Sequence, residues 1–365
     1  MAAILSQSQA TSPKGRAGHT FLAYGDNAVL LGGYDDSGAL DDIWIYETSR
    51  DTWVICSYNR MNPHPLPRVD FDCCILGSKL YLFGGMQSDG EQVLILNDLW
   101  TLDLDSGVWT MIMEECPVSE RMGHVCVALG DGYMLVHGGE CMGKCFDDIW
   151  IYNSNTNVWK AFPEANNNQS APVGRCSHSA CYQPESQAFV IFGGYTVEDG
   201  APVYLNDLWA INVSMLVGGG DGGGSAWKLI QSSDPSSLTP SPRDLPALVA
   251  LPDSHLLIAG GYGLVEVDRD DDMVMEDDDG EREAGVDLCY LADFWTVEIN
   301  FGTSAAQYTH LYTGDERENT LWANEDGRRG CKVLARPDGS LLSFGGFTGD
   351  GFSSVLEATT MTQLS

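Results

Sequence analysis

The chain has 365 residues, of which 44% are hydrophobic, so it can bury a large core without help from metals or disulfides. Its 52 acidic and 19 basic residues give a formal net charge of −33. Such a charge repels phosphate backbones and anionic membrane surfaces, which argues against nucleic-acid and membrane partners.

The N-terminal residues and the cysteines bear on the cellular compartment in which the protein is expected. No apolar run reaches the roughly twenty residues of a membrane span, and the start MAAILSQSQATSPKGR lacks the profile of a secretion signal. Eleven cysteines, several of them inside apolar runs, fit reduced thiols that pack as small hydrophobes. We therefore expect a soluble, monomeric, cytoplasmic protein without a cofactor, with the nucleus as an open alternative.

A repeated pattern organises almost the whole chain. A Gly pair ends an apolar run six times, and the second glycine of each pair is Gly33, Gly85, Gly139, Gly194, Gly261 or Gly346. An acidic residue, an apolar residue and a Trp follow the first five pairs, at Trp44, Trp100, Trp150, Trp209 and Trp295. An arginine precedes each pair, at Arg16, Arg68, Arg121, Arg175, Arg243 and Arg328.

Each unit contains four short runs of β-branched, aromatic and apolar residues separated by Gly, Asn, Asp and Pro, which predicts a four-stranded antiparallel meander. One such sheet cannot bury both of its faces, whereas six sheets packed around an axis can. Glycine permits close approach and positive φ near the crowded axis, and tryptophan fills the wider gaps outside. We therefore predict an all-β, six-bladed propeller that forms a single domain over residues 1–365.

The ends of the chain are expected to share the last blade. The sixth unit stops after its third strand, near VLEATTMTQL, and the stretch before Arg16 parallels the one that leads into Arg121. An open ring would leave an unpaired strand edge. Residues 2–7 are therefore predicted to be the fourth strand of the last blade.

The Gly pair, the spaced Trp and the upstream Arg together resemble the kelch repeat. The resemblance implies a six-bladed propeller that serves as a protein-binding platform. In kelch propellers that bind acidic motifs, arginines of this motif line the pocket. By similarity that role falls on Arg16, Arg68, Arg121 and Arg175, and less directly on Arg243 and Arg328, which stand in degenerate motifs.

The chemistry supports this site, because a guanidinium group suits bidentate capture of carboxylate or phosphate. The predicted partner is thus an acidic or phosphorylated protein segment bound at an arginine-lined channel mouth. In the alternative interpretation, each arginine is satisfied inside its own blade by backbone carbonyls or by acids such as Asp41, Asp42, Asp147 and Asp148.

Two insertions interrupt the repeats. Residues 217–225 are rich in glycine and predict a flexible loop on the face opposite the arginines. Residues 263–287 contain twelve acids and two arginines, which predicts a disordered acidic loop. This loop is either a solvated segment, an internal cover of the arginine face, or a tail for a basic partner.

Chemistry beyond binding has few candidates. Cys141 and Cys145 form a pair that fits either a redox site, half of a metal site, or ordinary loop thiols. We assign no catalytic residue and no metal ligand. The main hypothesis is a non-catalytic scaffold or substrate-recognition propeller; the alternatives are a kelch-fold enzyme, such as a specifier-like protein or a sugar mutarotase, and a small-GTPase effector in vesicle traffic.

Overall fold

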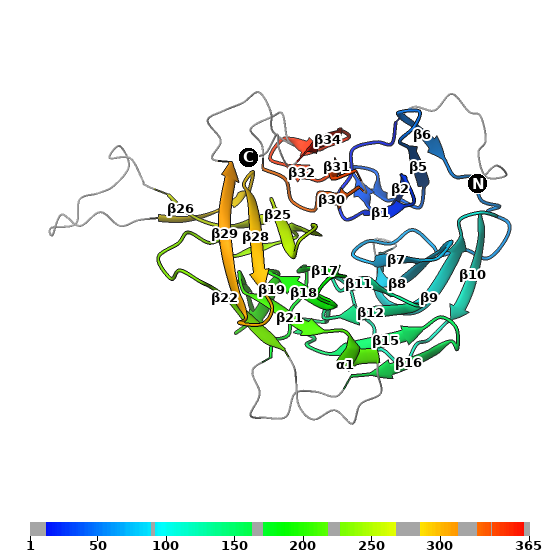
Figure 1. Ribbon diagram of the computed structural model, residues 1–365. Coiled ribbons are helices and arrows are strands. Elements are labelled where there is room, and N and C mark those ends of the chain that lie inside the picture. The colour runs from blue at the N-terminus through cyan, green and yellow to red at the C-terminus, as the bar shows by residue number, and fades with distance from the viewer. Residues whose placement is uncertain are drawn as a thin grey trace.

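A computed structural model describes residues 12–88, 92–162, 171–217, 227–267, 285–312, 327–336 and 338–360. Figure 1 shows strands arranged around a common centre, and among these residues the only helix is the short α1 (Ser214–Val217). No helix in the described ranges has the length and hydropathy that crossing a membrane requires.

The described strands form six antiparallel meanders, the last of them three-stranded. The first is β1 (Thr20–Tyr24), β2 (Asn27–Leu31), β5 (Ile43–Glu47) and β6 (Thr52–Ile55). The second is β7 (Asp72–Leu76), β8 (Lys79–Ser88), β9 (Val93–Asp103) and β10 (Val108–Met113). The third is β11 (Val125–Gly130), β12 (Tyr133–His137), β15 (Ile149–Asn153) and β16 (Val158–Ala161).

The remaining sheets follow the same order. The fourth is β17 (Ser179–Gln183), β18 (Ala188–Phe192), β21 (Leu208–Asn212) and β22 (Lys228–Ser232). The fifth is β24 (Ala247–Ala250), β25 (His255–Ala259), β28 (Phe294–Asn300) and β29 (Ala305–Tyr312). The sixth is β30 (Lys332–Ala335), β31 (Ser340–Phe344) and β34 (Leu356–Thr360). The outer strands β22 and β29 pair in parallel, which links the fourth sheet to the fifth.

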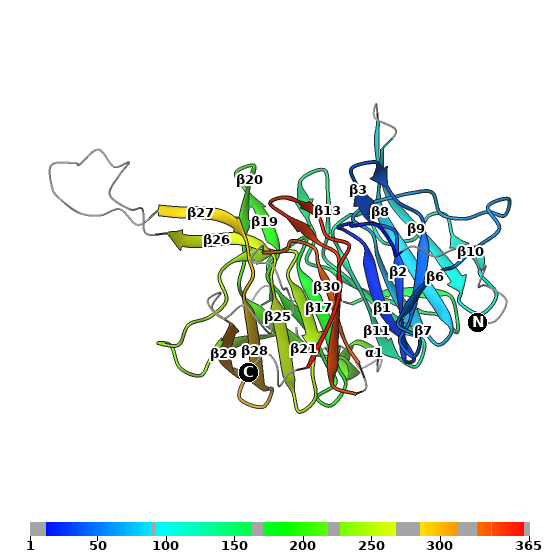
Figure 2. The ribbon, with the colours of Figure 1, turned by 90° about the horizontal axis from the view of Figure 1, so that it is seen from above.

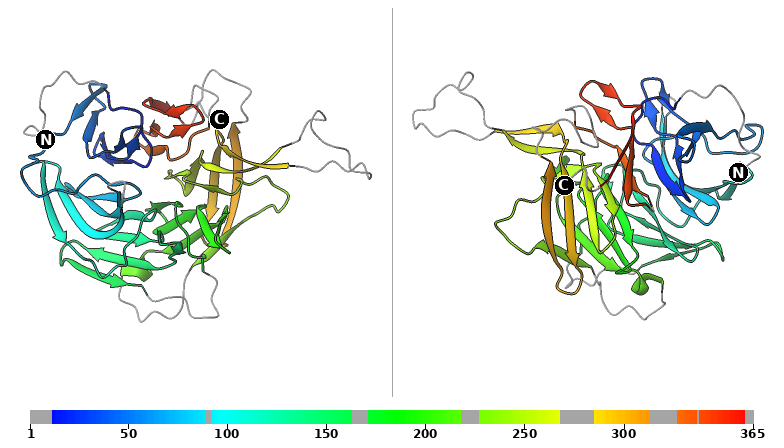
Figure 3. Two further views of the ribbon diagram at one scale, coloured as in Figure 1. Left: turned by 180° about the vertical axis from the view of Figure 1, so that it is seen from behind. Right: turned by 45° about the horizontal axis from the view of Figure 1, so that its top comes forward.

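The inner strands close a ring. Each of β1, β7, β11, β17, β24 and β30 contacts the next, and β30 contacts β1. Figure 3 shows the red strands of the sixth sheet beside the blue strands of the first. The all-β propeller prediction is therefore confirmed for the described residues, whereas the predicted closing strand at residues 2–7 lies outside them.

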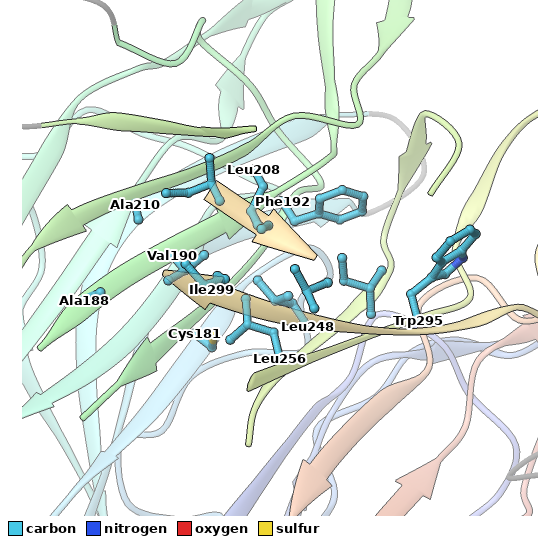
Figure 4. Packing of buried hydrophobic residues seen from close by; sticks show 14 residues of the cluster. Cys181, Ala188, Val190, Phe192, Leu208, Ala210, Leu248, Leu256, Trp295 and Ile299 are labelled. Atoms are coloured by element: carbon cyan, nitrogen blue, oxygen red, sulfur yellow. The ribbon is translucent and has the colours of Figure 1, made fainter. Parts of the chain in front are cut away.

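Apolar side chains fill every gap between neighbouring described sheets. The alternation of a strand sends Val29 and Leu31 of β2 toward the second sheet, and Leu30 of the same strand toward the sixth. This burial of both faces explains why these strands read as continuous apolar runs. Figure 4 shows one such gap, where Val190 and Leu208 of the fourth sheet pack near Leu256 of the fifth.

Short hairpins extend the meanders at one end of the ring, between the second and third strands of the sheets (Figure 2). They are β3 (Tyr34–Asp35) with β4 (Gly38–Ala39), β13 (Glu140–Cys141) with β14 (Lys144–Cys145), β19 (Tyr195–Glu198) with β20 (Ala201–Tyr204), β26 (Tyr262–Val267) with β27 (Gly285–Tyr290), and β32 (Phe347–Thr348) with β33 (Gly351–Phe352). The short strand β23 (Arg243–Asp244) pairs with β26. In the second sheet the strands β8 and β9 themselves continue at this end, with pairs from Gly85↔Leu96 to Ser88↔Val93. We call the hairpins and this part of β8 and β9 the crown.

The acidic insertion differs from its prediction at both ends. A loop was expected over residues 263–287, but β26 and β27 pair from Tyr262↔Tyr290 to Val267↔Gly285. Alternating apolar residues on both sides of the acidic run allow this ladder, which the net charge of the segment concealed. Residues 268–284 and most of the Gly-rich stretch 217–225 lie outside the described residues.

Candidate functional site

The six motif arginines are buried and lie inside their own sheets. The guanidinium of Arg121 is 0% exposed. Its Nη1 and Nη2 donate to the two carboxylate oxygens of Asp148 at 2.7 and 2.9 Å, Nη1 also donates to the Gly138 carbonyl at 2.8 Å, and Nε donates to the Ser119 carbonyl at 3.0 Å. Trp150 Nε1 donates to the same carboxylate at 2.8 Å. This network joins the entry to strand one, the end of strand two and the start of strand three.

The same network recurs around the ring. Its members are Arg16 with Asp42 and Trp44, Arg68 with Asp98 and Trp100, Arg175 with Asp207 and Trp209, and Arg243 with Asp293 and Trp295. In the sixth sheet Arg328 pairs with Glu357. All six arginines are at most 4% exposed.

This geometry corrects the prediction that Arg16, Arg68, Arg121, Arg175, Arg243 and Arg328 bind a partner. Their donors are committed to carboxylates and carbonyls of the same sheet, so an acidic ligand has no free guanidinium from this set to engage. The alternative interpretation, with the arginines satisfied inside their blades, is the one that fits. The partner acid is the residue two before each Trp, a spacing that the sequence shows in five units.

The carboxylates respond to this arrangement. Burial raises the pKa of the Asp148 carboxyl, but the hydrogen bonds and the charge of Arg121, with the Trp150 indole, outweigh it and leave that pKa below its ordinary value. The same balance lowers the pKa values of Asp42, Asp207 and Asp293. These acids therefore stay ionised at neutral pH and keep the ion pair within each of their sheets.

Buried histidines line the same end of the inner strands. His137 Nδ1 lies 3.0 Å from His178 Nε2, so one of the two rings donates to the other. Burial, with the nearby positive charge of Arg175, lowers the pKa of His137 to about 3. Burial also lowers the pKa of His178, and His137 adds to that effect.

These histidines make stability depend on pH. Because the pKa of folded His137 lies below its unfolded value near 6.5, only the unfolded chain takes up this proton between about pH 6.5 and 3, and His137 costs about 1.4 kcal/mol of stability per pH unit there. We expect the denaturant midpoint of His137→Gln to fall less steeply than that of the unmodified chain between pH 7.5 and 5.5. Buried acids such as Asp244 shift the opposite way, so the slopes of the two chains are compared rather than one read alone. Equal slopes would contradict a neutral, buried His137.

The channel between the inner strands is narrow. A cavity of ≈ 160 Å³ is lined by residues of β1, β7, β11, β17, β24 and β30, among them Asp72 and Lys332. Asp72 accepts the backbone N–H groups of Cys73 and Cys126 at 2.9 and 2.7 Å. Burial raises the pKa of Asp72, and the charge of Lys332 opposes that shift. The carboxylate thus holds neighbouring inner strands together.

The crown has a regular inner layer at its base. The residue after each Gly pair bridges to the residue after each motif arginine. The pairs are Ala17↔Tyr34, Val69↔Met86, Met122↔Glu140, Cys176↔Tyr195, Asp244↔Tyr262 and Arg329↔Phe347. These twelve positions, which the sequence prediction passed over, surround the mouth of the channel. The signal was present, because four of the six Gly pairs are followed by Tyr or Phe.

A continuous series of rings follows one side of the mouth. In order around the crown the rings are Tyr195, Tyr204, Tyr262, Tyr290, Phe347, Phe352 and Tyr34. Neighbouring ring centroids lie between 4.9 and 6.5 Å apart. All seven side chains are half-buried. We call this set the aromatic arc; because its side chains are only half-buried, part of their surface remains exposed to solvent.

Charged groups lie against the aromatic arc. Arg329 Nη2 donates to Asp244 Oδ2 at 2.8 Å, and the guanidinium carbon lies 5.3 Å from the Tyr262 ring centre. Asp244 is 1% exposed, and its Oδ1 has no hydrogen-bond partner among the described residues. Burial raises the pKa of Asp244 to about 6 although Arg329 opposes this shift. Burial also raises the pKa of Asp70, again against Arg329.

A second group of chemically active side chains lies at one end of the arc. Sequence analysis paired Cys141 with Cys145, but the structure brings Cys145 to Cys176, whose sulfur lies 4.0 Å from that of Cys145. Cys141 instead faces Lys144 across its own hairpin. Adjacent positions in a strand point to opposite faces, and the register of β13 and β14 decides which thiol turns toward the fourth sheet.

Comparison with known protein families finds two family models that match the chain. A family model described as the attractin/LZTR1 β-propeller matches residues 56–356, and one described as the kelch motif matches residues 15–59. The chain belongs to the attractin/LZTR1 β-propeller family. The kelch resemblance of its repeats is thereby confirmed.

The kelch propeller has relatives of several kinds. Host cell factor homolog hcf-1 of Caenorhabditis elegans is 26% identical over 284 residues, covering 72% of this chain and 33% of that protein. Human kelch domain-containing protein 3 is 27% identical over 260 residues, covering 68% of this chain and 62% of that protein. The chain thus spans less than two thirds of the length of these relatives.

A solved structure shares the fold. The structure of YjhT superposes with a TM-score of 0.64 over 94% of this chain and 95% of that chain, at 16% identity. At that identity the likeness concerns the fold alone.

Proposed function

We propose that this kelch propeller is a non-catalytic protein-interaction scaffold that receives a basic segment of a partner protein at its crown. The observation that supports this function is the aromatic arc beside a buried, incompletely paired carboxylate, Asp244. Its relatives include an F-box/kelch-repeat protein and host cell factors, all of which contain this kind of domain within longer chains. Its eleven cysteines all lie among the described residues and none is joined in a disulfide, which favours a reducing compartment, the cytoplasm or the nucleus.

The expected charge of the partner follows from the mouth itself. The sequence hypothesis of an acidic or phosphorylated segment required the six motif arginines, which are buried in ion pairs. Two carboxylates, Asp70 and Asp244, outnumber the single guanidinium of Arg329 at the mouth. The stacking of Arg329 over Tyr262 supports the proposal, because a guanidinium or ammonium group of the partner would gain the same kind of contact on the neighbouring rings of the arc.

Binding of designed peptides tests this function. We expect a ten-residue Gly/Ser peptide bearing two Arg and two Lys to bind the full chain, and the matching peptide with Glu at those positions not to bind. Tyr290→Ala, at the ring next to Tyr262, should weaken binding of the basic peptide about fivefold to thirtyfold, since a partly desolvated cation–π contact is worth about 1–2 kcal/mol. Tyr24→Ala, at the opposite end of the first sheet, should change nothing.

The experiment must distinguish binding at a specific site from general electrostatic attraction of a basic peptide to a chain of charge −33. Asp70→Asn and Asp131→Asn remove one charge each, the first at the mouth and the second in an exposed turn between β11 and β12. The proposal expects a clear loss of affinity from Asp70→Asn alone. Equal losses in both variants, or tighter binding of the Glu peptide, would refute a basic-segment site at the crown.

A further inference from the structure

Three side chains of the types that can bind a metal ion meet between the third and fourth sheets. Glu140 and Cys145 lie on the hairpin of β13 and β14, and Cys176 lies in the segment that enters the fourth sheet. One carboxylate oxygen and the two sulfurs all lie within 4.8 Å of one another. Cys176 is 1% exposed, while Glu140 and Cys145 are half-buried, so the cluster is partly exposed to solvent at the hairpin of β13 and β14.

The backbone holds these side chains in place. Glu140 is paired with Met122, and Cys176 with Tyr195. The Arg175 N–H donates to the Phe146 carbonyl at 3.0 Å, which fixes the chain beside Cys176 against the chain beside Cys145. A side chain at Gly174 would lie 2.7 Å from the Cys145 carbonyl, so the two segments are in close contact. The ligands therefore need no rearrangement of the backbone to stay together.

The spacing of the two sulfurs is compatible with a shared metal ion and shows that they are not bonded to each other. Two thiolates on a tetrahedral zinc, each about 2.3 Å from the metal, lie roughly 3.8 Å apart. A disulfide requires about 2.05 Å. The observed 4.0 Å separation is close to the first value and far from the second.

We propose that Glu140, Cys145 and Cys176 form a zinc site that ties the third sheet to the fourth and leaves a fourth ligand position open toward the crown. Two thiolates and a carboxylate are a donor set that zinc accepts, and an open fourth position is typical of zinc sites that bind water or an incoming group. The hydroxyl of Tyr195 donates to Glu140 Oε1 at 3.3 Å, an outer-shell contact that orients the carboxylate. Tyr195 is also the first ring of the aromatic arc.

Zinc binds cysteine in its thiolate form, so zinc binding would displace the thiol protons of Cys145 and Cys176. Zinc affinity should therefore fall at acidic pH.

Cobalt titration of the full, chelator-treated chain under reducing conditions tests the site. We expect one equivalent of Co²⁺ to produce a thiolate-to-cobalt charge-transfer band, and Zn²⁺ to displace it and raise the melting temperature. Cys145→Ser and Cys176→Ser should each lose the band, and Glu140→Gln should weaken Zn²⁺ binding by about tenfold or more. Cys141→Ser, a thiol in the same hairpin, is the matched control and should retain the band.

Other results would overturn the proposal. A band that persists in Cys145→Ser, or that disappears in Cys141→Ser, would place the metal on other thiols. The absence of a band in the unmodified chain would exclude the site. Mass spectrometry that finds Cys145 and Cys176 joined with the loss of two hydrogens, in a chain that binds no Zn²⁺ when reduced, would make the cluster a disulfide. The half-exposed Cys145 keeps the test valid if Cys176→Ser does not fold.

Discussion

Arg121→Ala is expected to destabilise the protein by about 3–5 kcal/mol, the usual cost of removing one partner of a buried ion pair. The substitution leaves the Asp148 carboxylate without its two guanidinium donors and the Gly138 carbonyl without its hydrogen bond. An uncompensated, partly buried charge and an unsatisfied carbonyl both raise the free energy of the folded state. The measurement is the free energy of unfolding in urea at pH 7.5.

A second arginine–aspartate pair serves as the matched control. Arg60 donates to both oxygens of Asp41 at 2.7 and 2.8 Å, but its side chain is 62% exposed. Exposed ion pairs contribute at most about 1 kcal/mol, so Arg60→Ala should cost little. If Arg121→Ala unfolds no more easily than Arg60→Ala, the motif arginines are not structural, and their role in partner binding would have to be reconsidered.

Gly139→Val is expected to cost about 3–5 kcal/mol as well. Gly139 has φ +91°, which L side chains rarely adopt, and a β-carbon there would lie 2.8 Å from the His124 β-carbon and from the Met122 carbonyl. Left-handed strain costs about 1–3 kcal/mol, and crowding of a packed core adds about 1–3 kcal/mol. Thermal unfolding of the two chains measures the difference.

Gly143→Val separates strain from crowding. Gly143 has φ +81°, but a β-carbon there meets no atom within 4 Å. It should therefore lose only the strain component, and its melting temperature should lie between those of the unmodified chain and Gly139→Val. Equal losses at Gly139 and Gly143 would show that the close approach of the second glycine to strand one is unimportant.

Repetition made the architecture predictable. A sheet that cannot bury both faces forces its copies to stack, so the Gly pairs and the tryptophans were enough to predict a propeller. The hairpins of the crown were not predicted. Strands as short as β3 and β13 are too short for an alternation of polar and apolar residues that would distinguish a strand from a turn. Their side chains nevertheless form the mouth.

The sequence allowed two roles for the motif arginines, partner binding and ion pairing inside the blade, but could not decide between them. Arg121 and Asp148 are separated by 27 positions, and only the fold shows that the guanidinium is closed off by its own sheet. The resemblance to kelch repeats implied that these arginines bind a ligand. That role requires an arginine that points into the channel mouth. The arginines are buried by the packing of neighbouring sheets, which favours ion pairing inside the blade.

The thiol cluster shows a different limit. Two cysteines four residues apart, Cys141 and Cys145, were the natural pair by sequence, yet Cys176, 31 residues after Cys145, supplies the neighbouring sulfur. A hairpin of two-residue strands determines which thiol faces the next sheet, and a shift of one position reverses that choice. Contacts between sheets therefore escape arguments from spacing.

The central proposal, that a partner's cation lies on the aromatic arc, is tested most directly by a double-mutant cycle. Tyr290→Ala is combined with replacement of each Arg of the basic peptide by Gln, and the four affinities are measured by calorimetry at one salt concentration. We predict a coupling energy of about 1 kcal/mol or more for one peptide position, because both changes remove the same contact. Additive effects at every position would show that the peptide cations do not lie on Tyr290, and would contradict recognition at the crown.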